Sequence, residues 1–324
     1  MTMYVLSVVK GMRLEMNNEL YKVIENLNKE YLTLQKQKCV KRHNRKKHIK
    51  KLIKKRKFKT LLREIYISIL TKTKYKNISS NKKDKVKIVE NNFNVEKSKK
   101  IVYTAILNNY DTIREPLFRM ENTDYVLYTD NESLINNTDS IWQVRRIPKY
   151  IKKLENPILI NRYIKIHAHE LFPEYDYAMY IDGTIKIMSE IDTLFKRINP
   201  KTGLGMHPHP KRCDVYEEAK ICLITKKGNK TKIKELIKKY EQEKFPKKYG
   251  LFEATIIAID LKNLSSKEIL EQWWIEFLKS ETYRDQLCFT YVLWKKGYKY
   301  DDIGLLGERV NTNYKFRRYK HKNY

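Results

Sequence analysis

Residues 100–111 read KIVYTAILNNYD, and this stretch decides the fold class. The run 101–107 is apolar, aromatic or β-branched throughout, which is typical of a strand buried on both faces of a sheet. The polar residues Asn108, Asn109, Tyr110 and Asp111 follow at once. Open α/β sheets bind ligands at the carboxyl ends of their strands, so a ligand loop is expected here. The same tetrapeptide is equally good turn chemistry, and both interpretations stay open.

The pattern of this first strand recurs further along the chain. Buried strands are predicted over residues 124–129, 177–181, 201–207 and 252–259. Amphipathic helices are predicted over residues 157–171, 231–244, 265–279 and 282–296. Strands that alternate with helices favour an α/β fold with a mostly parallel sheet and helices on both faces.

The charge divides the chain near residue 100. The 324 residues include 68 Lys and Arg against 38 Asp and Glu, a net charge of +30. Residues 1–100 hold 29 basic and 8 acidic residues, net +21, and neither Gly nor Pro occurs between Met12 and Glu115. We therefore predict a basic helical extension and linker over residues 1–99 and the α/β domain over residues 100–324.

The predicted extension combines apolar and basic segments. An apolar seam at alternating spacings of four and three residues suits pairing with another helix. It consists of Leu20, Ile24, Leu27, Tyr31 and Leu34. Residues 36–59 then hold 14 Lys and Arg and no acidic residue, and a second apolar stripe follows within residues 61–70. Residues 71–100 are polar without a clear pattern, and we interpret them as a linker.

Three interpretations of the basic run stay open. It is a solvated helix face, a segment that docks on an anionic membrane through residues 36–70, or a nucleic-acid binding segment. Aromatic residues are sparse in the run, which argues against a stacking platform for single strands. Of the two functional interpretations the membrane is favoured, and no specific nucleic-acid partner is expected.

Several classes of protein are excluded. No apolar run approaches the roughly 20 residues that span a bilayer. The opening MTMYVLSVVKGM lacks a basic start and a cleavage site, so we expect a cytoplasmic protein, peripheral to the inner face of a membrane. Four cysteines without paired spacing exclude a disulfide scaffold. The P-loop, dinucleotide-binding, nucleophile-elbow and zincin motifs are all missing from the sequence.

Polar groups follow two further predicted strands. Asp182-Gly183 comes directly after YAMYI, where a carboxylate is well placed to reach a divalent cation that holds a diphosphate. His207 and His209 alternate, so in an extended segment both imidazoles face one side, as metal ligation or a diphosphate contact requires. An ordinary Asp-Gly turn and a rigid proline loop are the structural alternatives.

The triplet Arg284-Asp285-Gln286 opens a predicted helix. Charged residues at a helix N-terminus often serve only as caps. The same position also lets Asp285 and the amide of Gln286 contact sugar hydroxyls. The residues by themselves leave both roles open.

Taken in order, these segments resemble a known family. The resemblance rests on KIVYTAILNNYDTIREP, DYVLYTD, NRYIK, YDYAMYIDGTIKI, MHPHPKRCDVYEEA, LFEATIIAID and RDQLCFTYVLWK. They are similar to the glycosyltransferase-like domain of the plant turgor-regulation-defect and mucilage-related proteins, which also occurs in bacterial surface-polysaccharide clusters. The resemblance covers about residues 100–310. It implies a GT-A fold, a Rossmann-like sheet that binds a nucleotide-sugar, and transfer of the sugar to an acceptor hydroxyl.

The resemblance also implies roles for single residues. The nucleotide pocket and its rim would be formed by Tyr103, Thr104, Ala105, Tyr110 and Asp111. Arg162 and Lys165 would face the donor phosphates. Asp182, followed by Gly183, stands where the first acid of the Asp-x-Asp metal motif is expected, but Thr184 occupies the second acid position. A Mn²⁺ or Mg²⁺ ion would therefore need another ligand, for which His207 is the best candidate.

The acceptor side carries the remaining predictions. The resemblance makes Asp285 and Gln286 acceptor or catalytic candidates, and Glu253 and the pair Glu217-Glu218 are further carboxylates for a general base. We expect a glycosyltransferase that moves a sugar from a nucleotide-sugar to a glycan or glycolipid acceptor in surface polysaccharide or glycoconjugate synthesis. The alternatives are a non-catalytic binding protein whose basic arm holds nucleic acid or acidic polymer, and a hydrolase of a sugar- or lipid-linked substrate.

Overall fold

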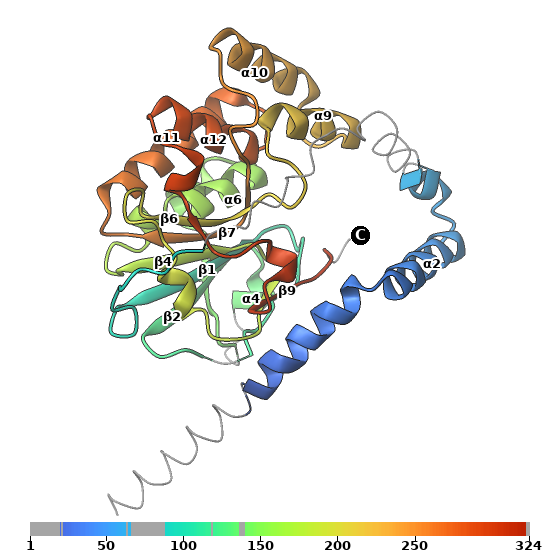
Figure 1. The fold of residues 1–324 in the computed structure, drawn as a ribbon, viewed down its shortest axis with the longest axis horizontal. Coiled ribbons are helices and arrows are strands. Elements are labelled where there is room, and N and C mark those ends of the chain that lie inside the picture. The colour runs from blue at the N-terminus through green and yellow to red at the C-terminus, as the bar shows by residue number, and fades with distance from the viewer. Residues whose placement is uncertain are drawn as a thin grey trace, which may run out of the picture.

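The computed structural model describes most of the chain, namely residues 20, 22–62, 64–65, 88–117, 119–135 and 140–321. It shows an α/β domain with a helical extension beside it (Figure 1). In the described part of the extension, a helix over residues 22–36 is followed by α2 (Lys38–Lys54). Among the residues described, no helix combines the length and the apolar character needed to cross a membrane.

Within the described residues a seven-stranded sheet forms the centre of the domain. Its strands are β1 (Lys100–Ile106), β2 (Thr123–Thr129), β3 (Gln143–Arg146), β4 (Tyr177–Ile181), β6 (Leu204–Pro208), β7 (Phe252–Asp260) and β8 (Gly304–Leu305). They lie in the order β3-β2-β1-β4-β7-β6-β8. In this sheet β7 runs antiparallel to its neighbours β4 and β6, and the other pairs are parallel. The predicted α/β class with a mostly parallel sheet is confirmed.

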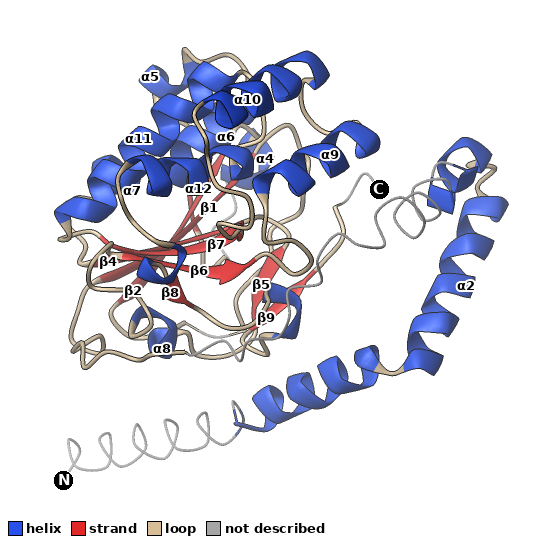
Figure 2. Ribbon diagram, turned by 45° about the horizontal axis from the view of Figure 1, so that its top comes forward, coloured by secondary structure: helices blue, strands red, loops and turns tan. Residues whose placement is uncertain are grey.

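The long helices cover one face of the sheet (Figure 2). They are α6 (Pro157–Ile166), α9 (Val215–Thr225), α10 (Lys230–Gln242), α11 (Leu264–Ser280) and α12 (Gln286–Lys295). Their inward side chains form one core with the strands, and aromatic residues such as Tyr103, Tyr240 and Trp273 are fully buried in it. Large aromatic side chains contribute most of the buried apolar area in a core of this kind.

Shorter elements cover the opposite face. They are α8 (Asp192–Phe195), η2 (Val310–Thr312) and a two-stranded sheet of β5 (Ile185–Ile187) and β9 (Phe316–Arg318). Phe195 of α8 and Phe316 of β9 pack on Ile181 and other strand residues in a second core. Helices therefore lie on both faces of the sheet, but unequally. The remaining short elements are α4 (Glu132–Ile135), α5 (Lys149–Lys152), α7 (Ala168–Leu171) and η1 (Tyr300–Asp302).

Three predicted elements begin or end differently in the structure. The helix predicted over 157–171 is interrupted at His167, whose φ of −95° and ψ of 43° are not helical, and resumes as α7. Helix α12 begins at Gln286 instead of residue 282, because Tyr283 has a left-handed φ of 58° that no α-helix accommodates. Strand β6 begins at Leu204, after a turn in which Gly203 has a φ of +64°.

Residues 88–99, which the sequence places in the linker, lie against the domain. The backbone N–H of Asn91 donates to the Lys196 carbonyl at 2.7 Å, and its side-chain amide donates to the Ile198 carbonyl at 2.6 Å. Val95 is fully buried in the second core. The structured domain therefore starts before β1. The rest of the predicted linker and residues 66–70 at the end of the second apolar stripe lie outside the described residues.

Candidate active site

The topology brings most of the candidate residues to one edge of the sheet. The carboxyl ends of β1, β2, β4 and β6 meet there because these strands are parallel. Since β7 is antiparallel, its first residues reach the same edge, and Glu253 aligns with His207 of β6. In such sheets ligands bind outside the carboxyl ends of the strands, so this edge is the candidate site.

The loop after β1 is held by its neighbours. Both carboxylate oxygens of Asp130 accept a hydrogen bond from the Asn108 N–H, at 2.9 and 3.1 Å, and the Asn131 amide donates to Asn109. Asn108 and Asn109 both have a left-handed φ of 52°, which Asn tolerates better than most residues. The loop is therefore a fixed turn at the edge of the sheet, and its binding of a ligand stays a prediction.

Asp182 and Gly183 follow β4 directly. Tyr180 donates its hydroxyl proton to Asp182 Oδ1 at 2.9 Å, and the Asp182 N–H donates to the Thr255 carbonyl at 2.9 Å. A side chain on Gly183 would come within 2.9 Å of Ile106 at the end of β1, so only glycine allows this close approach. The carboxylate of Asp182 is thereby fixed in orientation and only partly buried.

Asp285 lies in a buried ion-pair cluster beside Asp182. Its Oδ1 is 3.0 Å from Arg162 Nε, and its Oδ2 accepts from Lys165 Nζ at 2.7 Å. Burial acts to raise the pKa of Asp285, but Arg162 and Lys165 outweigh it and hold that pKa well below its ordinary value. The same pairing occupies Lys165, which is 3% exposed, whereas the Arg162 side chain remains 21% exposed.

The charge of Arg162 extends this cluster to Asp182. Burial acts to lower the pKa of Arg162, but the carboxylates of Asp285 and Asp182 outweigh it and hold that pKa above its ordinary value. The two carboxylates Asp182 and Asp285 therefore flank one guanidinium group. The predicted donor-side pair Arg162 and Lys165 thus divides into one partly exposed cation and one buried structural cation.

Glu253 and Gln286 meet where α12 contacts the start of β7. The Gln286 amide donates to the Phe252 carbonyl at 2.6 Å, next to Glu253 in the chain. Glu253 Oε1 accepts from Arg318 of β9 at 2.6 Å and from the Thr255 hydroxyl at 3.3 Å. Its other oxygen, Oε2, is buried and has no hydrogen-bond partner among the described residues. A buried polar atom without a partner is unusual in a folded protein, and its place at a ligand edge makes Glu253 a candidate for a catalytic role.

The two predicted metal ligands lie on different strands. β7 separates Asp182, which follows β4, from His207 on β6, so their backbones are about 10 Å apart. The His207 ring is fully buried, its Nε2 lies 3.1 Å from the Asn313 amide, and burial lowers its pKa to about 3. Within the described residues no three His, Cys, Asp or Glu side chains are grouped for one metal ion. Asp182 and His207 therefore do not fit a preformed metal site.

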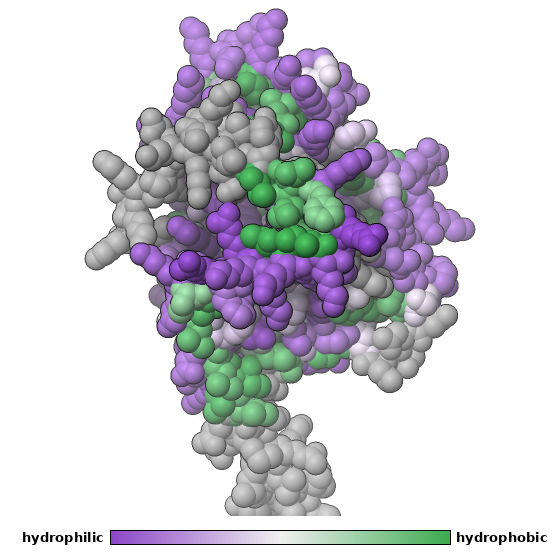
Figure 3. Space-filling model, turned by 90° about the vertical axis from the view of Figure 1, so that its right-hand side faces the viewer, coloured by the Kyte–Doolittle hydropathy of each residue, from purple (hydrophilic) through white to green (hydrophobic). Residues whose placement is uncertain are grey.

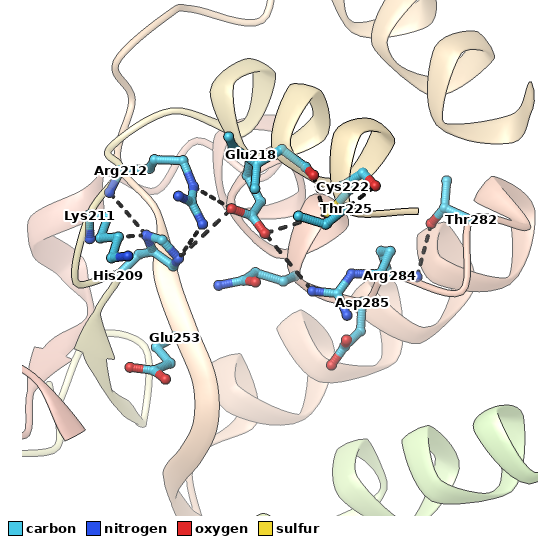
Figure 4. A network of polar contacts seen from close by, with 12 residues as sticks. His209, Lys211, Arg212, Glu218, Cys222, Thr225, Glu253, Thr282, Arg284 and Asp285 are labelled. Carbon is cyan, nitrogen blue, oxygen red and sulfur yellow. Dashed lines mark hydrogen bonds and ion pairs between the residues drawn. The ribbon is translucent and has the colours of Figure 1, made fainter. Parts of the chain in front are cut away.

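His209 belongs to a separate polar network around Glu218 (Figure 4). Glu218 accepts from Arg212, lies 3.9 Å from Arg284 and 3.8 Å from His209, and accepts from the Cys222 thiol at 3.5 Å. Burial and then the charges of Arg212 and Lys211 lower the pKa of His209 to about 3. Glu253 and Asp285 lie beside this network, and Figure 4 draws no hydrogen bond or ion pair from either side chain to it. Glu218 is therefore paired with basic side chains, which makes it a poor candidate for the general base.

The C-terminal segment lies across the candidate edge. β9 pairs with β5 directly after the Asp182 loop, and the Tyr319 N–H donates to the Thr184 carbonyl at 2.8 Å. The imidazole of His321 lies 2.8 Å from Asp111 Oδ2, and its ring contacts Tyr110 with centroids 4.6 Å apart. Both predicted rim residues therefore contact this segment. Sequence reasoning missed Arg318 and His321 because no motif marks a contact between positions so far apart in the chain.

The residues predicted to line the nucleotide pocket are more deeply buried than expected. The Tyr103 hydroxyl donates to the Lys165 carbonyl at 2.8 Å inside the core, and Tyr103 is fully buried. The Ala105 carbonyl accepts from the Asn161 amide at 3.2 Å. Thr104 is also buried, and its hydroxyl lacks a hydrogen-bond partner within the described residues. These three residues are therefore part of the buried core next to the candidate edge.

Two hollows lie away from this edge. One of about 510 Å³ is lined by residues at the amino ends of the strands, among them Lys99, Thr123 and Tyr175. Another of about 260 Å³ lies between α6, α7 and α11 and is lined by His167, His169 and Lys267. Neither contains a candidate residue from the sequence, so the carboxyl edge remains the best supported site.

An α/β domain that gathers carboxylates, guanidinium groups and amides at one sheet edge has the architecture of a ligand-binding domain. The model of a protein family, described as the TOD1/MUCI70, glycosyltransferase-like domain, matches residues 70–302. The chain belongs to this family, and the resemblance drawn from the sequence is confirmed. The helix 22–36, α2 and the segment from Ile303 to His321 lie outside the matched residues.

One curated relative and several solved structures are similar to the chain. Alkaline ceramidase TOD1 of Arabidopsis thaliana is 25% identical over 147 residues, which are 39% of this chain and 31% of that protein, so the chain spans about a third of the relative's length. Mouse xyloside xylosyltransferase 1 is 10% identical with a TM-score of 0.38, covering 63% of this chain and 83% of that one. Galactosyltransferase LgtC, solved with donor and acceptor sugar analogues, is 16% identical with a TM-score of 0.38, covering 62% and 72%.

Proposed function

We propose that this chain is a glycosyltransferase that moves a sugar from a nucleotide-sugar to an acceptor hydroxyl. Membership of a glycosyltransferase-like family supports this class of reaction. The observation that carries the proposal is the position of Glu253. Its unpartnered, buried Oε2 lies at the same sheet edge as the fixed carboxylate of Asp182 and the partly exposed guanidinium of Arg162.

The donor binds at the carboxyl ends of β1 and β4 in this proposal. The turn Asn108–Asp111 and the backbone beside Gly183 contact the nucleoside, because these two loops pack against each other. Arg162 faces the diphosphate. Negative charge develops on that leaving group as the bond from the anomeric carbon to the phosphate oxygen breaks, and a fixed cation lowers the barrier by stabilising it.

Glu253 is the general base in this proposal. It accepts the proton of the acceptor hydroxyl while that oxygen forms its bond to the anomeric carbon, and the nucleotide diphosphate leaves. Asp285 is less suited to this step, because its pKa is held low and both its oxygens face cations. We assign Asp285 to positioning Arg162. Gln286, beside Glu253, contacts the acceptor, a glycan or glycolipid.

A divalent cation at Asp182 stays a prediction that an experiment must test. The full-length chain is mixed with a panel of nucleotides and nucleotide-sugars, with and without Mn²⁺, and its thermal unfolding is measured. A ligand at about 100 times its Kd stabilises a protein by roughly 2.7 kcal/mol, which is readily seen. We expect one nucleotide diphosphate to raise the Tm and Asp182→Asn to weaken that shift.

The rate of sugar transfer from the donor that raises the Tm then tests whether Glu253 is the general base. Glu253→Gln is expected to retain the nucleotide-induced Tm shift and to lose sugar transfer by about 10²–10⁴-fold, the usual contribution of a general base. Glu271→Gln, an exposed carboxylate on α11, is the matched control and should transfer at the wild-type rate. Absence of a Tm shift with every nucleotide contradicts the proposal and favours a non-catalytic binding protein.

A lipid amide hydrolase is the second candidate function. The name of the Arabidopsis relative, alkaline ceramidase, supports it. Release of a fatty acid from ceramide by the wild-type chain, with no requirement for a nucleotide-sugar, would favour this candidate. Hydrolysis of a nucleotide-sugar without acceptor would instead indicate a glycan-related hydrolase that uses the same site.

A further inference from the structure

The helix over residues 22–36 turns its most apolar side to solvent. Leu20, Val23, Leu27 and Leu34 are each more than half exposed, at 51–58%. Their spacing of three, four and seven residues places them on one side of a helix, and we call these four residues the apolar row. Single exposed leucines are common, but a continuous row of them marks an interaction surface.

The opposite side of the same helix is fastened to the domain. Asn28 is 1% exposed, its amide donates to the Tyr314 carbonyl, and its carbonyl accepts from Arg317 at 2.7 Å. Glu25 accepts from the Ser189 hydroxyl at 2.7 Å, and the Lys29 ammonium lies 4.4 Å from the Tyr314 ring centroid. These polar contacts fix which side of the helix points away from the domain. The domain therefore does not cover the apolar row.

The following segment supplies a dense positive charge. Residues 36–59 contain 14 Lys and Arg without any acidic residue, and nearly all of them in α2 are exposed. Apolar side chains are exposed within this segment, namely Ile53 at 48% and Phe58 at 53%, and directly after it, namely Leu62 at 65% and Ile65 at 43%. Figure 3 shows hydrophobic groups surrounded by hydrophilic ones on this side of the molecule.

A second copy of the chain fits the apolar row poorly. The row runs over 15 residues, from Leu20 to Leu34, a rise of about 21 Å along a helix, which is only about two heptads and shorter than a stable coiled coil. Pairing two copies would also bring two strongly basic α2 segments close together, and like charges repel. Nucleic acid would account for the cations, but it gives no reason to expose leucine, isoleucine and phenylalanine beside them.

We propose that residues 20–65 form a docking surface for an anionic lipid bilayer. The apolar row and Phe58, Leu62 and Ile65 enter the boundary between headgroups and acyl chains, and the lysines and arginines of α2 face the negative headgroups. This surface lies outside the matched family residues and does not depend on the proposed sugar transfer. The proposal thus specifies which side chains of the extension face the lipid.

The docking surface is connected to the candidate site through β9. Arg317 bonds to Asn28 of the extension, and the next residue, Arg318, bonds to Glu253 at the site. Successive residues of a strand point to opposite sides, so one short strand contacts both regions. A bilayer bound by the extension would therefore lie in a fixed orientation relative to the site edge.

Binding of the full-length chain to lipid vesicles tests the proposal. The vesicles are phosphatidylcholine alone or phosphatidylcholine with phosphatidylserine, at low and high salt, without any nucleotide. We expect binding to the anionic vesicles that weakens in high salt. Val23→Glu/Leu27→Glu should reduce it by about tenfold or more, and Lys46→Glu/Lys47→Glu by about thirtyfold or more.

Matched variants separate the surface from general effects of charge. Leu264→Glu adds an acid at a leucine that is 78% exposed on the domain, and Lys234→Glu/Lys238→Glu makes the same charge change on the exposed side of α10. Both controls should bind vesicles like the wild type, and circular dichroism should show unchanged helix content in all variants. Equal losses in the controls, or equal binding to neutral vesicles, would overturn the proposal. So would a dimer in solution that Val23→Glu/Leu27→Glu dissociates.

Discussion

The domain and the extension differ in how their charged side chains are placed. In the domain, Asp285 at the edge and Glu218 in the neighbouring polar network are buried, and each lies between basic side chains. In the extension, the 14 basic residues of 36–59 have no acidic residue among them, and most point into solvent. The net charge of the whole chain, +30, is thus largely a property of the extension.

This difference in burial determines how strongly a substitution of a charged residue changes the free energy of unfolding. A buried charge loses its hydration on folding, so removal of its partner leaves an uncompensated cost. An exposed charge keeps its hydration, and changing it affects stability by less than about 1 kcal/mol. We therefore expect substitutions at the edge to change folding, and substitutions in α2 to change association with partners.

The largest effect on stability is expected for Asp285→Asn. The substitution leaves the buried Lys165 and Arg162 without their carboxylate, which should lower the free energy of unfolding by about 3–5 kcal/mol. Urea unfolding near neutral pH measures this loss. Asp301→Asn, at an exposed aspartate of η1, is the matched control and should change stability by less than about 0.5 kcal/mol.

The pH dependence of the same variant sharpens this prediction. The folded-state pKa of Asp285 is lowered, so its stabilising contribution is complete above its ordinary value of 3.8 and is lost as the pH falls further. The difference between wild type and Asp285→Asn should therefore shrink in strong acid. A constant difference from neutral pH down to about pH 2 would contradict the assignment of a buried ion pair.

A smaller effect is expected at His169. Its Nε2 lies 3.0 Å from the Ser266 hydroxyl, and burial, followed by the charge of Lys267, lowers its pKa to about 4. Between its ordinary pKa of 6.5 and about 4 the unfolded chain binds a proton that the folded chain does not, so stability falls as the pH decreases through this window. His169→Gln should remove about 2–3 kcal/mol of that acid sensitivity.

Urea unfolding at about pH 7 and about pH 4 measures the contribution of His169. His169→Gln should be less stable than the wild type at the higher pH and should lose the deficit at the lower pH. An equal deficit at both values would show that the substitution acts through packing alone. That outcome would remove His169 as support for the view that buried charged groups of the domain control its stability.

The sequence predicted the parts of the fold that depend on local pattern. The limits of β4 at residues 177–181 were predicted without error, because an uninterrupted apolar run ends there at Asp182-Gly183. α9 went unnoticed, because two glutamates and a lysine interrupt its apolar residues. β5 and β9 also went unnoticed, because each has three residues and forms only by pairing with the other across the chain.

The sequence predicted which residues gather at the candidate edge, but it did not predict which of them are paired or buried. Asp182, Asp285 and Glu253 converge there because the strand order brings the carboxyl ends of β1 and β4 together with the start of β7. Whether a carboxylate is paired depends on residues far along the chain. Lys165 lies 120 positions from Asp285, and Arg318 lies 65 positions from Glu253. No local pattern in the sequence reports such partners.

The smallest effect is expected where the extension meets the domain. Asn28→Ala removes the hydrogen bonds to the Tyr314 carbonyl and Arg317, which should weaken the attachment of helix 22–36 by about 1–2 kcal/mol. Amide hydrogen exchange should then accelerate in residues 22–36 and in β9, but not in β1 or β4 of the core. Glu30→Ala, at an exposed position on the same helix, should leave exchange unchanged. Faster exchange throughout the domain would mean that the extension stabilises the site edge itself, and the two regions could no longer be treated as separate.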